Sequence, residues 1–144
     1  MENRPPYGNQ VTDFTDAERI AALLMEAQED AATKMKIAND YQRQLKENMD
    51  EAAVLEAEQL DMAYRTGAID GKNAEARERQ ALLYMAQNSQ VKAARLHVAK
   101  LQRMVDDARL ESEIANKRLG ALHSVANLTA AQLMFMAGSA RANF

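Results

Sequence analysis

The longest regular pattern in the chain is a seven-residue repeat of apolar side chains between residues 15 and 66. The two core positions of the repeat alternate at three- and four-residue spacing, and such spacing lies on one face of an α-helix. No Gly or Pro interrupts this stretch, and Thr15 and Glu18 have the spacing of a capping box. The pattern predicts one long helix. The core positions are Leu24, Ala31, Ala38, Leu45 and Ala52, alternating with Ile20, Ala27, Lys34, Tyr41, Asn48, Leu55 and Met62.

A second repeat of the same kind predicts another long helix from residue 73 to residue 125. Polar Lys34 and Asn48 interrupt the first repeat, where such residues can fix the pairing register, whereas the second is nearly free of them. Gly120 lies inside the second repeat, where it weakens the helix. The core positions are Tyr84, Val91, Val98, Val105, Ser112 and Leu119, alternating with Ala94, Leu101, Ala108, Ala115 and Leu122.

Two glycines separate these repeats. Gly67 suits a left-handed helix C-cap, and Gly71 follows four residues later. A turn is therefore expected near residues 67–72, with Asp70 or Asn73 capping the next helix. Two long helices joined by a short turn fold back on each other as an antiparallel pair.

The chain ends differ from the repeats. Residues 1–14 hold two Pro and one Gly and are expected to form a flexible arm. Residues 128–144 are expected to form a short apolar helix and a tail, with a second capping box starting at Thr129 and a stop at Gly138. The predicted fold is all-α: a long antiparallel helical hairpin, or coiled coil, over residues 15–127, followed by the short C-terminal helix.

A two-helix hairpin buries little apolar surface, so we expect further helices from other copies of the chain. The expected assembly is a homo-oligomeric helical bundle. An apolar cluster near the C-terminus is its candidate interface, comprising Leu133, Met134, Phe135 and Met136.

Candidate chemistry is sparse. The chain has no Cys, which excludes disulfides, thiolate zinc sites and cysteine nucleophiles. His97 and His123 are isolated, and no catalytic or phosphate-binding motif occurs. We therefore expect a protein that is not an enzyme, with no cofactor, no metal site, no small-molecule substrate and no membrane partner.

Charge is unevenly distributed, with an acidic first half and a basic second half around a net charge of −3. Acidic and basic helices facing each other would explain this as antiparallel pairing. The alternative is a basic stripe that contacts a nucleic-acid backbone. Its candidate residues are Arg77, Arg79, Lys92, Arg95, Lys100 and Arg103.

The residues around the turn, Tyr64 to Arg77, resemble a segment of small all-helical proteins from tailed phages and prophages. In that family a comparable Asp-Gly-Lys-Asn-Ala-Glu-x-Arg turn, here residues 70–77, separates two Ala-rich helices. Some family members are encoded near recombination or single-strand-annealing genes. The resemblance implies a phage origin and a role near DNA.

These observations together predict a phage-type helical interaction and assembly protein, an accessory to DNA metabolism that partners DNA or a DNA-metabolism protein. Two alternatives stay open: a nucleic-acid-binding accessory protein, and a structural or scaffold component of the virion. The expected location is the host cytoplasm, or the virion for the last alternative.

Overall fold

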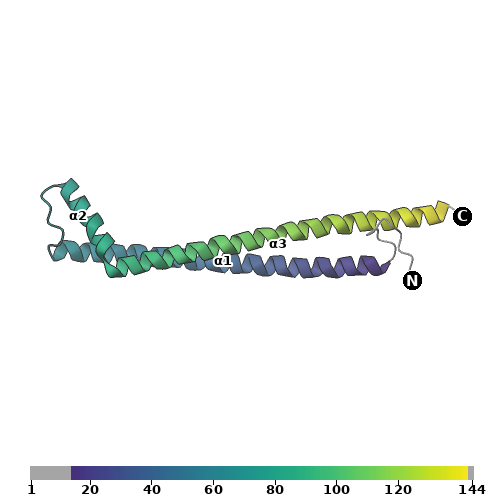
Figure 1. The fold of residues 1–144 in the computed structure, drawn as a ribbon, viewed down its shortest axis with the longest axis horizontal. Coiled ribbons are helices and arrows are strands. Elements are labelled where there is room, and N and C mark those ends of the chain that lie inside the picture. The colour runs from purple at the N-terminus through teal and green to yellow at the C-terminus, as the bar shows by residue number, and fades with distance from the viewer. Residues whose placement is uncertain (1–13, 143–144) are drawn as a thin grey trace, which may run out of the picture. The chain divides into compact units, whose positions relative to one another are not determined.

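The computed structural model describes residues 14–142, which form three α-helices without a β-strand (Figure 1). They are α1 (Phe14–Arg65), α2 (Ala74–Gln87) and α3 (Ser89–Ala142). The predicted all-α class is confirmed. The predicted N-terminal arm lies outside the described residues except for Phe14, which begins α1 one residue before the predicted start.

The chain divides into two compact units. One unit, residues 36–110, contains the second half of α1, the turn, α2 and the start of α3. The other described unit pairs residues 14–35 of α1 with residues 111–142 of α3.

Within residues 36–110, α1 and α3 run in opposite directions. Cross-helix hydrogen bonds join Gln42 to Arg109 and Glu56 to Arg95, so partner numbers fall as α1 numbers rise. The core between these segments is Leu45, Leu101 and Val105, with Tyr41 and Val98 packed against it.

Burial follows the predicted seven-residue repeat on both long helices. The buried core positions are Ala27, Ala31, Ala38 and Leu45 on α1, and Val91, Leu101, Val105, Ala108, Ser112 and Ala115 on α3. Met62 is an exception, since it is exposed while neighbouring Ala63 is fully buried. The Ile69 backbone N–H donates to the Ala63 carbonyl at 3.2 Å, so the folded-back turn covers Ala63 instead.

The polar core residues of α1 find partners in different ways. Lys34 Nζ lies 3.5 Å from Glu111 Oε2 on α3, within the unit of residues 14–35 and 111–142. Asn48 instead donates to the Gln44 carbonyl of its own helix at 2.8 Å. Of these two residues, Lys34 makes a cross-helix contact that can select the pairing register.

The turn forms where the glycines predicted it. Gly67 has φ +80°, a conformation that favours glycine. Asn73 caps α2, its side chain accepting from the Ala76 N–H at 2.8 Å. A Cβ on Gly71 would lie 2.9 Å from the Ala76 Cβ, so the chain needs glycine there for space.

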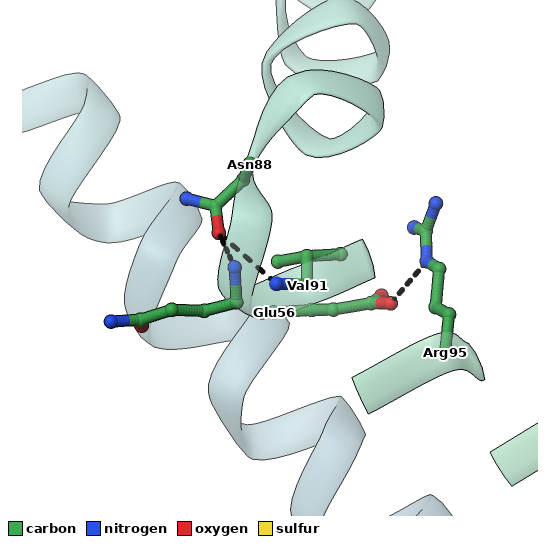
Figure 2. Close-up of polar contacts among 5 residues, drawn as sticks. Glu56, Asn88, Val91 and Arg95 are labelled. Carbon is green, nitrogen blue, oxygen red and sulfur yellow. Dashed lines mark hydrogen bonds and ion pairs between the residues drawn. The ribbon is translucent and has the colours of Figure 1, made fainter. Parts of the chain in front are cut away.

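The prediction of one unbroken helix over residues 73–125 is wrong, because the chain breaks at Asn88. The Asn88 Oδ1 accepts from two backbone N–H groups, those of Gln90 and Val91, each at 3.0 Å. Figure 2 shows the bond to Val91. The Asn88 Nδ2 donates to Gln59 Oε1 on α1 at 2.9 Å. Asparagine thus ends α2 and caps α3, as its short polar side chain readily does.

The prediction of a separate C-terminal helix is also wrong. α3 continues without interruption through Gly120, Thr129 and Gly138 to Ala142. Thr129 is buried, and its hydroxyl donates to the Val125 carbonyl at 2.9 Å inside the helix. This bond satisfies the hydroxyl that a capping box would have used.

Candidate functional site

Most polar groups of the motif at residues 70–77 form hydrogen bonds within the turn and the start of α2. Gln80 Oε1 accepts from the backbone N–H groups of Asp70 and Gly71, at 3.0 and 2.8 Å, and Gln80 Nε2 donates to Asp70 Oδ1. Arg77 Nη1 donates to the Gly71 carbonyl at 3.3 Å. The motif therefore has a structural role that accounts for most of its polar groups.

Three of the six predicted nucleic-acid-binding residues are engaged by other groups. Besides Arg77, Arg79 pairs with Glu75 at 2.6 Å on the surface of α2. Arg95 Nε donates to Glu56 Oε1 at 2.7 Å across the helix pair, as Figure 2 shows. This hydrogen bond and the charge of Glu56 raise the pKa of Arg95.

The other three predicted residues, Lys92, Lys100 and Arg103, are exposed on α3. Among the described residues, no ion pair involves any of these three. The structure thus reduces the predicted basic stripe to three cations on one helix. Salt-dependent phosphate binding grows with the number of contacts, so three cations give a weak site.

An open pocket of about 240 Å³ lies beside the Arg95–Glu56 pair. Ala52, Ala53 and Val98 form part of its wall. Met49 completes the apolar lining. Its polar lining groups, Glu56 and Arg95, are paired with each other, so the pocket offers few groups that would orient a small ligand.

The predicted C-terminal interface residues do not share one face. Leu133 is half-buried on the core side of α3, whereas Met134 and Phe135 are each 76% exposed. Met136 is 46% exposed. Consecutive helical residues are about 100° apart, so a partner helix could contact only part of this cluster.

Within residues 14–142, no group of three or more His, Asp or Glu side chains is placed to hold a metal ion. None of the described helices is both long and apolar enough to cross a bilayer.

Sequence reasoning missed a second apolar repeat on α3. Ile114, Ala121, Leu128 and Phe135 recur at seven-residue intervals, and all four are exposed. They lie on the side of the helix away from buried Ala115 and Thr129. Their regular spacing was the available signal.

In comparisons with known proteins, no family model, no curated protein and no solved structure matches this chain.

Proposed function

We propose that the chain is a non-enzymatic, phage-type helical interaction protein that self-associates through coiled-coil surfaces. In this proposal α1 and α3 form an antiparallel coiled-coil hairpin, with α2 inserted at the turn. The seven-residue repeat of burial on both helices supports the coiled coil. The resemblance at residues 64–77 supports a phage origin and a role as an accessory to DNA metabolism in the host cytoplasm.

The observation that carries the proposal is the set of large apolar side chains that α3 leaves exposed near its end. Met134 and Phe135 are among these residues, and Leu128 is another. The segment from Leu119 to Ala140 contains no Asp, Glu, Lys or Arg, so no charged side chain favours its exposure to water. Large exposed apolar patches mark protein interaction sites.

Protein interaction is preferred to nucleic-acid binding for an electrostatic reason. Glu56 and Glu75 neutralise two of the six candidate cations, and Arg77 is held against the turn. The apolar side chains at the end of α3, by contrast, stay exposed and available for contact.

The native mass in solution tests the proposal. Light scattering with sedimentation at equilibrium should give two or more times the 16.0 kDa chain mass. A 16.0 kDa species at every concentration up to about 1 mM, where contacts weaker than about −4 kcal/mol dissociate, would contradict it.

A DNA titration on the same preparation distinguishes the nucleic-acid alternative. Under the proposal, the double variant Lys100→Glu, Arg103→Glu forms the same oligomer as the wild-type chain, because these exposed side chains lie outside the apolar surface. If the wild-type chain binds labelled DNA at low salt and this variant does not, DNA binding is a function of the chain itself, and the alternative replaces our choice.

A further inference from the structure

The second apolar repeat of α3 has the form of a coiled-coil core that lacks its partner helix. The second core position of this repeat lies three residues after each of Ile114, Ala121, Leu128 and Phe135. The full series is Ile114, Lys117, Ala121, Ser124, Leu128, Ala131, Phe135 and Gly138. It spans three and a half heptads, which is long enough for a coiled coil.

The structure shows that this face is open and that its hydroxyl group is satisfied. Ile114 is 59% exposed and Leu128 is 60% exposed, and the smaller residues of the series are exposed as well. Ser124 Oγ donates to the Gly120 carbonyl at 3.2 Å, within its own helix. A partner could therefore cover Ser124 without leaving an unsatisfied donor.

We infer that a second copy of the chain covers this face, with the two α3 helices antiparallel and centred on residue 126. This register pairs all eight positions of the series with one another. Antiparallel pairing about residue 126 places Ile114 opposite Gly138 and Leu128 opposite Ser124, so both of these large aliphatic side chains meet small ones. Ala121 then lies opposite Ala131.

Charge supports the same orientation. A parallel, in-register pair would stack Lys117 on Lys117 of the other copy, and like charges at such close range repel. In the antiparallel register Lys117 lies opposite Phe135, whose ring can pack on the lysine stem and attract its ammonium group. Lys117 is the one charged residue of the series, so no other charge opposes self-pairing.

This inference rests on the proposed self-association and names the face responsible for it. The test compares two substitutions at equally exposed leucines of α3: Leu128→Glu inside the series and Leu96→Glu outside it, where Leu96 is 59% exposed. Leu128→Glu should weaken self-association at least about tenfold, because two glutamates would enter the core near the symmetry axis. Leu96→Glu should leave it unchanged.

Circular dichroism should report the same helix content for both variants, because both side chains point into solvent in the single chain. If Leu128→Glu associates as tightly as wild type, another face makes the oligomer and the inference is wrong while the proposed function stands. If the wild-type chain is itself monomeric, both are wrong.

Cysteine crosslinking tests the orientation, since the chain has no native Cys. In the antiparallel register Asn127→Cys lies near its own counterpart and should form a disulfide dimer on mild oxidation. Met134→Cys should not crosslink to itself but should crosslink to Gly120→Cys in a mixture. Self-crosslinking of Ala131→Cys, a core position that faces its own counterpart only in a parallel in-register pair, would overturn the antiparallel register.

Discussion

At the scale of single residues, the fold depends on a few side chains that lose nearly all contact with water. Val91 and Val105 are completely buried, and Leu101 joins Val105 in a cluster of larger apolar residues within residues 36–110. Many other core positions are Ala, which contributes little buried area. The larger residues therefore provide most of the hydrophobic stabilisation of residues 36–110.

Leu101→Ala should lower the free energy of unfolding by about 2–3 kcal/mol, because it removes buried methyl groups and leaves a cavity beside Leu45. Urea denaturation followed by circular dichroism measures the change. The matched control is Leu96→Ala on the exposed side of the same helix, expected to change stability by less than about 0.5 kcal/mol. Equal losses in the two variants would refute the assigned core.

At the scale of elements, Asn88 makes the boundary between α2 and α3. Its backbone N–H donates to the Tyr84 carbonyl, which closes α2, while its side chain caps α3 and reaches Gln59. Gln59 in turn donates to Gln90 at 2.9 Å. The helix break is therefore fixed both by hydrogen bonds to the adjoining helices α2 and α3 and by a hydrogen bond to α1.

Asn88→Ala should destabilise the protein by about 1 kcal/mol, the usual cost of a lost N-cap. Asn88→Asp keeps the capping oxygen but loses the amide that donates to Gln59, and it should recover most of the loss. Thermal unfolding of the three proteins gives the comparison. An alanine variant as stable as wild type would mean that the cap contributes nothing to stability.

At the scale of the whole molecule, the proposed self-association would couple to stability. If another copy covers the exposed apolar face of α3, the folded chain gains stability, since only the folded chain presents that face. Because folded domains are stable by only about 5–15 kcal/mol, a contribution of about 1–2 kcal/mol from association would be measurable.

The melting temperature should therefore rise with protein concentration. If the oligomer is a dimer, a hundredfold increase in concentration adds about 2.7 kcal/mol per dimer, or about 1.4 kcal/mol per chain, to the apparent stability, which corresponds to several degrees. Differential scanning calorimetry at two concentrations measures this shift, with Leu128→Glu as the control that loses it. A concentration-independent melting temperature for the wild-type chain would contradict the coupling.

Much of the fold could be read from local pattern alone. The repeat through Leu24, Ala31, Ala38 and Leu45 identified one face of α1, because helical periodicity is a local property. The turn at Gly67 could be predicted in the same way, since its left-handed backbone conformation favours glycine.

Contacts between distant residues decided the rest. Asn88 ends a helix partly because Gln59, 29 residues earlier, binds its amide. Arg95 is not a free cation of the predicted basic stripe, because Glu56, 39 residues earlier, accepts its hydrogen bond. Periodicity marks two apolar faces on α3, but only packing against α1 determines that the face of Leu101 and Val105 is buried, whereas Ile114 and Leu128 stay exposed.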